Sequence, residues 1–306
     1  GAFAEPPRKL VYGFRGRMDE RQDMLRSASD GRYVYIRNYM PHKVYGQYLA
    51  YMFQTPTTRV WRQLHREGKL NAAQQIFWNT KPPEELYDLR DDPDEVHNLA
   101  DSREHQEILT RLRLAQRELA LAIRDVGFLP EGEIHDRSQG VSPYDMGHDQ
   151  TKYPLERILK TAEMASGLKP QATPGLIKSL EDPDSAVRYW AALGLLMRGR
   201  GGVAAGRDSL LSELADPSPY VRIVAAEALA RFGDPTDLGL ALSVLEKSAD
   251  WSQNNVFTAI SALNALDETG DKAVDAWLRL RQSPAKGQSP HARYSEYVQR
   301  LLKVEK

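Results

Sequence analysis

Charged side chains are concentrated in residues 13–21, a segment with no clean hydrophobic periodicity. The guanidinium group of arginine presents a planar fork of N–H donors that suits oxyanions, whereas carboxylates suit hydroxyl groups. Residues 1–45 hold nine Lys or Arg against five Asp or Glu, and this excess of four positive charges favours a polyanionic ligand. The alternative is a set of solvated charges on strand edges. The candidate binding residues in this segment are Arg15, Arg17, Asp19, Glu20 and Arg21.

Histidine and acidic clusters offer further candidates. His42 lies in a loop after a predicted strand, and we add it to the candidate binding residues, although a loop histidine is commonly only solvated. The pairs His135-Asp136 and His148-Asp149 could bind a metal or orient a proton donor, but a polar linker has the same composition. The acidic run at 88–95 lacks the glycine and the terminal glutamate of a calcium loop. We therefore predict a turn there, with carboxylates capping backbone N–H groups, and no metal site.

The most distinctive motif is ELYDLRDDPDEVHNLA at residues 85–100. It closely resembles the C-terminal signature of type I sulfatases, in which Glu-Leu-Tyr-Asp-Leu, Asp-Pro, Glu and Asn-Leu-Ala recur at this spacing. The runs at 24–28 and 33–39, and the segment 13–21 before them, resemble the strands upstream of that signature. The nearest likeness is to the heparan N-sulfatase (sulfamidase) branch, and the resemblance covers about residues 1–125.

The resemblance implies a parent enzyme of the alkaline-phosphatase-like superfamily that hydrolyses sulfate esters or N-sulfates. Such enzymes use a formylglycine, made from Cys or Ser in a Cys/Ser-x-Pro-Ser-Arg motif, and a divalent cation, usually calcium. The 306 residues contain no cysteine and no Ser-x-Pro-Ser-Arg motif. We therefore assign no catalytic residue, no metal ligand and no cofactor to this chain. The calcium ion and the formylglycine are expected in an N-terminal catalytic domain of the parent.

Two copies of one motif lie 34 residues apart in the second half, DPDSAVRYWAA at 182–192 and DPSPYVRIVAA at 216–226. Because proline cannot continue a helix interior but suits the first turn, each Asp-Pro should end one helix and cap the next. The Asp-Pro-x-x-x-Val-Arg pattern resembles HEAT repeats, which usually bind proteins or their own chain through a concave face. We assign structural roles to Arg188 and Arg222. Further helices are predicted at 155–165, 176–180, 210–214, 238–248, 254–266, 273–281 and 291–303.

The first half shows shorter, β-prone runs at 11–15, 24–28, 33–39 and 85–89, with Asp30-Gly31 marking a hairpin turn. A helical stretch at 58–78 is interrupted near Gly68, and a helix capped by Asp101 should run to Gly127. The predicted fold is an α+β sulfatase C-terminal subdomain, a small antiparallel sheet plus helices, joined to an all-α HEAT-like repeat domain. The predicted boundaries are 1–128 for the subdomain, 129–153 for an ordered loop or linker, and 154–306 for the repeats.

Composition narrows the possible partners. Hydrophobic residues make up 41% and charged residues 27% of the chain, as in soluble globular proteins. A net charge of −1 argues against a globally basic nucleic-acid binder. No apolar run approaches the ~20 residues that span a bilayer. We expect neither nucleic acid nor membrane as a partner.

We interpret the chain, which begins at Gly1 rather than Met, as the truncated or processed C-terminal portion of a sulfatase acting on a sulfated glycan. The expected partners are the missing N-terminal sulfatase catalytic domain, a sulfated glycan and a protein bound to the repeats. The family implies export to the periplasm, the extracellular space or the lysosome. The alternative is a non-enzymatic adaptor that binds proteins through its repeats. The first interpretation expects surplus exposed aromatic surface within residues 1–125, and the second expects it within 150–306.

Overall fold

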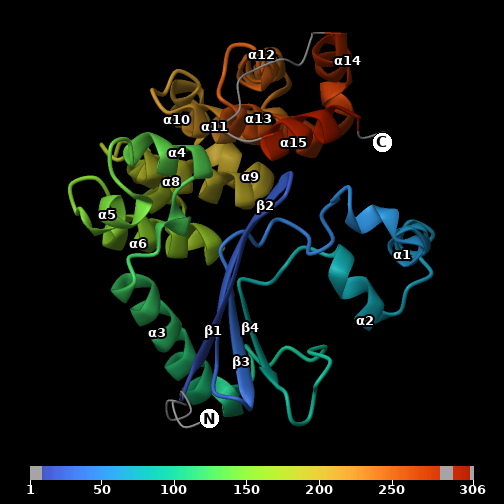
Figure 1. The fold of residues 1–306 in the computed structure, drawn as a ribbon, viewed down its shortest axis with the longest axis vertical. Helices are drawn as coiled ribbons and strands as arrows, with labels where there is room; N and C mark the ends of the chain where they lie inside the picture. The colour runs from blue at the N-terminus through green and yellow to red at the C-terminus, as the bar shows by residue number, and fades with distance from the viewer. Residues whose placement is uncertain (1–8, 283–291, 304–306) are drawn as a thin grey trace. The chain divides into compact units, whose positions relative to one another are not determined.

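The computed structural model describes residues 9–282 and 292–303, and the chain divides into two compact units. Of the described residues, the first unit comprises 9–18 and 22–125, and the second comprises 19–21, 126–282 and 292–303. The first unit is an antiparallel sheet with helices, and the second is helical (Figure 1). The predicted fold class is therefore confirmed. The elements of the first unit are β1 (Val11–Met18), β2 (Arg21–Ser29), β3 (Tyr33–Asn38), α1 (Pro56–Arg66), α2 (Ala72–Gln75), β4 (Glu84–Asp88) and α3 (Gln106–Ala122).

The sheet has the strand order β1-β2-β3-β4, so each strand lies beside its neighbour in sequence. Ala28 of β2 is opposite Tyr35 of β3, which in turn is opposite Leu86 of β4. The turn between β2 and β3 forms as predicted. Gly31 adopts a φ of 93°, and the Asp30 carboxylate accepts hydrogen bonds from the backbone N–H groups of residues 32 and 33 at 3.0 and 2.8 Å.

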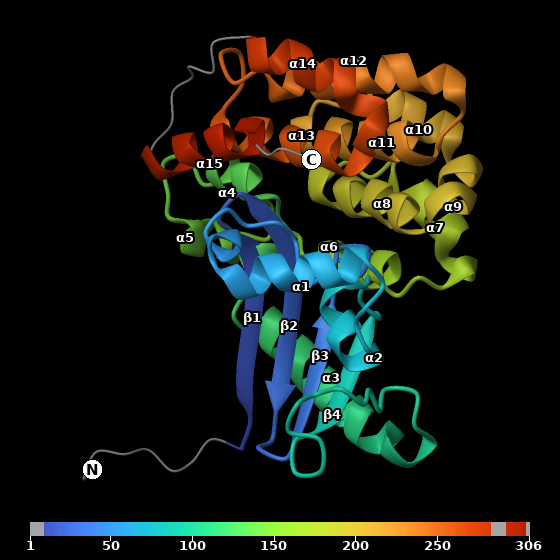
Figure 2. The same ribbon diagram turned by 90° about the vertical axis from the view of Figure 1, so that its right-hand side faces the viewer.

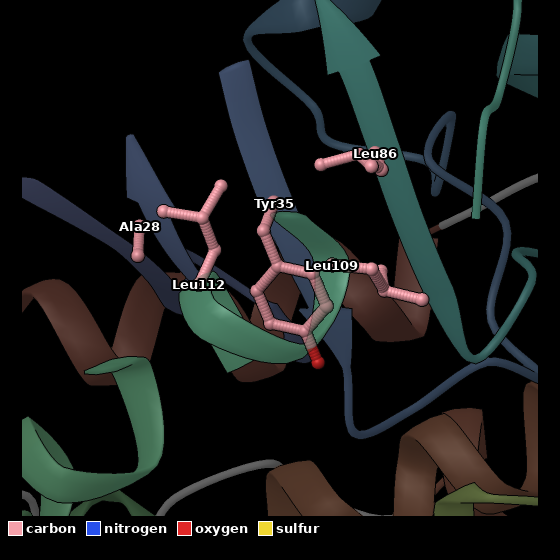
Figure 3. Packing of buried hydrophobic residues seen from close by; sticks show 5 residues of the cluster. All are labelled: Ala28, Tyr35, Leu86, Leu109 and Leu112. Atoms are coloured by element: carbon pink, nitrogen blue, oxygen red, sulfur yellow. The ribbon is translucent and has the colours of Figure 1, made fainter. Parts of the chain in front are cut away.

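The core of the first unit lies between the sheet and α3. Because side chains alternate across a strand, the aligned residues Ala28, Tyr35 and Leu86 share one face. They pack against Leu109 and Leu112 of α3, and all five side chains are buried (Figure 3). Helices α1 and α2 lie on the other side of the sheet (Figures 1 and 2). Gly68, with a φ of 65°, separates α1 from α2, which confirms the predicted interruption.

The predicted start of α3 is wrong. Asp101 does not cap it; a short 3-10 helix, Arg103–His105, comes first, and α3 begins at Gln106. The reason is that the preceding residues are still held to β4, through a hydrogen bond from the Leu99 amide to the Leu86 carbonyl at 2.7 Å. Helix α3 ends at Ala122, before Arg124 with a φ of 54°, rather than at Gly127.

The second unit is built from helices that stack in succession. Helix α6 contacts α8, α8 contacts α11, and α11 contacts α13 (Figure 2). A second set of helices packs beside these: α7 contacts α8, α10 contacts α11, and α12 contacts α13. The predicted start of the last helix at residue 291 lies outside the described residues. The bounds are α4 (Glu131–Arg137), α5 (Pro143–His148), α6 (Leu155–Ser166), α7 (Thr173–Ser179), α8 (Ser185–Met197), α9 (Gly199–Ala205), α10 (Arg207–Glu213), α11 (Pro219–Phe232), α12 (Leu238–Ala249), α13 (Val256–Thr269), α14 (Val274–Gln282) and α15 (Ala292–Lys303).

The two copies of the repeated motif adopt the same local structure. Arg188 donates to the carbonyls of Asp182 and Pro183, and Arg222 donates to those of Asp216 and Pro217. The paired alanines at 191–192 and 225–226 are completely buried, as close helix packing requires. These contacts confirm the structural role predicted for both arginines.

One detail of the repeat prediction is wrong. Asp182 and Asp216 do not cap the following helices; their carboxylates accept the amides two residues on, at 2.8 and 2.6 Å, and so brace the turn. The cap of α8 is Asp184, whereas Ser218 makes no side-chain cap for α11. Pro183 and Pro217 lie within the turns, so each helix starts after them. The N-cap positions are therefore Asp184 and Ser218 rather than Asp182 and Asp216.

Two segments hold helices that the sequence did not predict. Residues 129–153, expected as a loop, contain α4 and α5, and α5 begins at Pro143 behind a Ser142 side-chain cap. Helix α9 is rich in glycine, which opposes helix formation, but its Val203 side chain is fully buried. In α9 a buried contact thus outweighs a weak local propensity, whereas α5 has local start signals in Ser142 and Pro143.

Candidate functional site

The candidate arginines of β1 differ in their surroundings. Arg15 is half-buried; its guanidinium lies 3.6 Å from the Asp23 carboxylate and donates to the Tyr45 carbonyl at 3.2 Å. Arg17 lies two residues further along the strand, hence on the same face, and its side chain is exposed. Of the six candidate binding residues, Arg17 is thus the one that the structure places in open contact with solvent.

Asp19, Glu20 and Arg21 follow β1, and they belong to the second unit. Arg21 is buried, donates to the Asn264 side chain at 2.8 Å and pairs with Asp267 at 2.7 Å. Glu20 is fully buried, and its carboxylate lies 3.8 Å from the Arg300 guanidinium. Asp19 accepts a hydrogen bond from the Tyr297 hydroxyl at 2.7 Å. These three charges are engaged in packing contacts within their unit.

The histidine candidates lie apart from one another. His42 is half-buried in the loop after β3. The His135 ring stacks on Phe257 with a centroid separation of 4.6 Å, and burial raises the pKa of the neighbouring Asp136. The His148 ring packs against the Tyr144 ring with a centroid separation of 4.2 Å, and its Nδ1 lies 2.8 Å from the Tyr144 carbonyl oxygen. Within residues 9–282 and 292–303, the structure contains no group of three or more His, Asp or Glu residues placed to hold a metal ion.

A buried polar cluster lies behind Arg15. The Lys81 ammonium pairs with the Asp23 carboxylate at 2.5 and 2.6 Å, and both side chains are completely buried. Burial lowers the pKa of Lys81, although the Asp23 charge opposes this shift. The nearby Glu85 carboxylate accepts hydrogen bonds from the side chains of Asn38 and Tyr45. This cluster holds the loops at 41–47 and 79–83 against the sheet, so it positions Arg15 rather than acting on a ligand itself.

The residues of the 85–100 motif hold a turn together. The Asn98 side chain accepts the amides of Leu86 and Ala100 and donates to the Glu84 carbonyl. The Asp92 carboxylate accepts the amides of residues 96 and 97, at 3.2 and 2.8 Å. A bidentate hydrogen bond from Arg32 lowers the pKa of Asp88 to about 2. Asp92 and Asp88 thus cap backbone N–H groups, as the sequence predicted, and Asp88 also pairs with Arg32.

Exposed aromatic side chains occur in both units. Phe14 of β1 is 82% exposed and Tyr51 is 55% exposed, while Tyr144 in the second unit is 69% exposed. Other large aromatic residues of the first unit, Tyr35, Tyr39 and Trp78, are buried and add nothing to this surface. Because exposed aromatic side chains occur in both units, their location does not favour either the sulfatase or the adaptor interpretation.

Sequence reasoning missed a second basic feature, the arginines Arg59, Arg62 and Arg66 of α1. Two signals in the sequence point to it. Residues 31–66 contain six Lys or Arg and no Asp or Glu, and the three arginines are spaced by three and four residues, which places them on one helix face.

Comparison with known proteins gives two matches. The family of HEAT repeats matches residues 207–287. The chain is also similar to an ulvan-active sulfatase of Formosa agariphila, with 38% identity over 135 residues. That match covers 44% of this chain and 23% of the relative, so the chain spans about a quarter of the curated protein it matches. Within the described residues, no helix is both long enough and apolar enough to cross a bilayer.

Proposed function

We propose that this chain is the C-terminal portion of a sulfatase that acts on a sulfated glycan. The observation that carries the proposal is the 38% identity to an ulvan-active sulfatase over 135 residues. The turn built by the 85–100 motif is consistent with it, because that motif is the part of the sequence that resembles type I sulfatases. The substrate is then an anionic polysaccharide carrying sulfate esters or N-sulfates.

The catalytic groups of the proposed enzyme lie outside this chain. The formylglycine nucleophile and the calcium ion belong to an upstream catalytic domain, which is the chain's principal partner. There the metal would stabilise charge that builds on the sulfate oxygens during hydrolysis. We place the enzyme in the alkaline-phosphatase-like superfamily, near the sulfamidase branch, and expect an exported protein. Ulvan, named for the relative, is the first polysaccharide to try as a substrate.

Within this chain, the basic face of β1 is the proposed contribution to the substrate rim. Arg17 is exposed, and Arg15 is positioned through Asp23. A guanidinium group donates two parallel hydrogen bonds to sulfate oxygens, so Arg17 should help to bind a sulfated chain without taking part in bond cleavage. His42, Asp19, Glu20 and Arg21 remain candidates for a supporting role.

The test uses the longer protein that contains this chain. We expect it to release sulfate from ulvan oligosaccharides, and Arg17→Gln to raise KM about tenfold while kcat changes little. Arg90→Gln, an exposed arginine of the turn after β4, is the charge-matched control and should leave both constants unchanged. Absence of sulfate release from a panel of sulfated glycans and aryl sulfates would refute the proposal.

The HEAT repeats favour a second candidate function, a protein-binding adaptor. Repeats of this family present extended surfaces that bind other proteins. If the longer protein proves inactive and the second unit retains a protein partner with a defined Kd, the adaptor becomes the better description.

A further inference from the structure

Helix α1 carries three arginines on one face. Arg59, Arg62 and Arg66 fall within an arc of about 60° around the axis, because a helix turns by 100° per residue. Seven residues separate the first from the last, which corresponds to about 10 Å along the helix. The helix contains no acidic residue, so no carboxylate on it balances these charges.

Each guanidinium group is held or exposed in a different way. Arg59 donates to the carbonyls of Phe53 and Gln54, at 3.0 and 2.8 Å, which fixes its head group near the start of the helix. Arg62 lies over the Phe53 ring at 4.4 Å and over the Tyr48 ring at 5.6 Å. Arg66 is exposed. None of the three has a carboxylate partner in the described part of the chain.

This lack of neutralisation contrasts with other arginines of the same unit. Arg26 pairs with Asp125 at 2.7 Å, and Arg113 pairs with Glu84 at 2.6 Å. On α1, by contrast, burial lowers the pKa of Arg62, and the like charge of Arg66 lowers it further. Like charges at this spacing destabilise a helix by a few tenths of a kcal/mol. Arg59, Arg62 and Arg66 therefore form a cluster of like charges that no carboxylate in the described residues neutralises.

We propose that the arginine face of α1, defined by Arg59, Arg62 and Arg66, is a binding surface for the sulfate or carboxylate groups of an anionic polysaccharide. A row of cations about 10 Å long suits a ligand whose anionic groups repeat along a chain. The contacts with the two rings hold the Arg62 guanidinium in place. A guanidinium group has N–H donors that suit an oxyanion. This surface is separate from the β1 arginines and consists of different residues.

The surroundings of the arginines favour a polysaccharide over a nucleic acid. Proteins that bind single-stranded nucleic acids stack bases on exposed aromatic rings. Here Phe53 is buried and Arg62 lies over both it and Tyr48, so neither of these two rings is open to a stacking base. The choice of a sulfated glycan among anionic polysaccharides rests on the proposed function.

The test measures binding of the 306-residue chain to fluorescently labelled dextran sulfate by anisotropy, with unsulfated dextran of the same length for comparison. We expect binding to the sulfated polymer alone, weakening steeply as salt is raised. Arg62→Gln/Arg66→Gln should weaken it by about tenfold or more, because two charge-assisted contacts are lost. The control Arg90→Gln/Arg103→Gln removes two exposed charges of the same unit and should change affinity less than about twofold.

Because Arg62 packs on two rings, melting curves must show that each variant is folded, and Arg66→Gln alone provides a variant with an exposed side chain. Unchanged affinity in the folded double variant, equal binding of unsulfated dextran, or tighter binding of a single-stranded oligonucleotide of equal charge would each overturn the proposal. Sulfate release by the longer protein is a separate measurement. If that activity is absent while the α1 variants lose dextran sulfate binding, the proposed function fails and the surface stands.

Discussion

At the scale of single residues, the Lys81–Asp23 ion pair is a contact of the first unit whose disruption should lower the free energy of unfolding strongly. Both side chains are fully buried, so removal of one leaves the other as an unpaired charge away from water. We predict that Lys81→Met lowers the free energy of unfolding by about 3 kcal/mol, measured by urea denaturation. The double variant Lys81→Met/Asp23→Leu should recover a large part of the loss, because no charge is then left buried.

The control for this prediction is Lys69→Met. Lys69 also pairs with a carboxylate, Glu67 at 2.8 Å, but its side chain is 65% exposed, so the change should cost less than about 1 kcal/mol. Equal losses in Lys81→Met and Lys69→Met would contradict the argument from burial.

A second residue-scale prediction concerns pH. Burial and hydrogen bonding to Asp216 raise the pKa of Glu213 to about 8, while the Arg188 guanidinium keeps Asp216 ionised. The folded state then binds a proton more tightly than the unfolded state between pH 4.5 and about 8. Stability from this group is therefore fully present below pH 4.5 and is lost as pH rises through 8.

Glu213→Gln should remove that dependence, because the amide stays neutral. We predict a gain of about 1 kcal/mol at pH 8.5, discounted for partial exposure, and no gain at pH 4. Thermal melting at the two pH values measures the difference. A gain of equal size at both would show that the carboxyl group does not titrate in this range.

At the scale of elements, the two copies of the repeated motif allow Arg188 to be compared with its counterpart Arg222. Arg188 and Arg222 make the same two carbonyl contacts, but Arg188 also pairs with Asp216 at 2.6 and 3.0 Å. We predict that Arg188→Gln destabilises the second unit by about 1–2 kcal/mol more than Arg222→Gln, as measured by chemical denaturation. Similar losses would mean that the ion pair between successive repeats contributes little.

The same elements show what the sequence could and could not predict. The 34-residue offset predicted α8 and α11 because buried alanines and a proline at fixed positions leave few alternatives. The hairpin was predicted because Asp30-Gly31 encodes its turn locally. Helices α4 and α9 were missed because polar or glycine-rich segments become helical only through contacts that are distant in sequence.

The candidate site was harder to predict than the fold for a physical reason. Charge density in a sequence does not say whether a charge will be neutralised. Arg21 lies in a segment dense in charge, yet it is buried and paired with Asp267. Arg66 lies in a helix that the sequence did not single out, and it forms no ion pair with any described residue. The stretch 31–66 lacks acidic residues, and Arg59, Arg62 and Arg66 within it have no carboxylate partner in the described residues. Arg32 of the same stretch nevertheless pairs with Asp88, which lies far away in sequence.

At the scale of the whole molecule, the decisive question is whether this chain alone can hydrolyse a sulfate ester. We predict that it cannot, even with millimolar calcium. None of its 306 residues is a cysteine, no Ser-x-Pro-Ser-Arg motif occurs, and the described residues hold no group of three or more metal-ligating side chains. Without an activated nucleophile and a cation, nothing stabilises the charge that develops on sulfate during attack.

The measurement is the release of 4-nitrophenol from its sulfate by the purified chain, with the longer protein as the positive control. Calcium should also leave the melting temperature of the chain unchanged, because a ligand stabilises only a folded state that binds it. Turnover that persists through purification and disappears on mutation of a residue within the chain would show that a catalytic centre lies here. In that case the proposed division of labour, with chemistry upstream and anion binding on β1 and α1, would have to be abandoned.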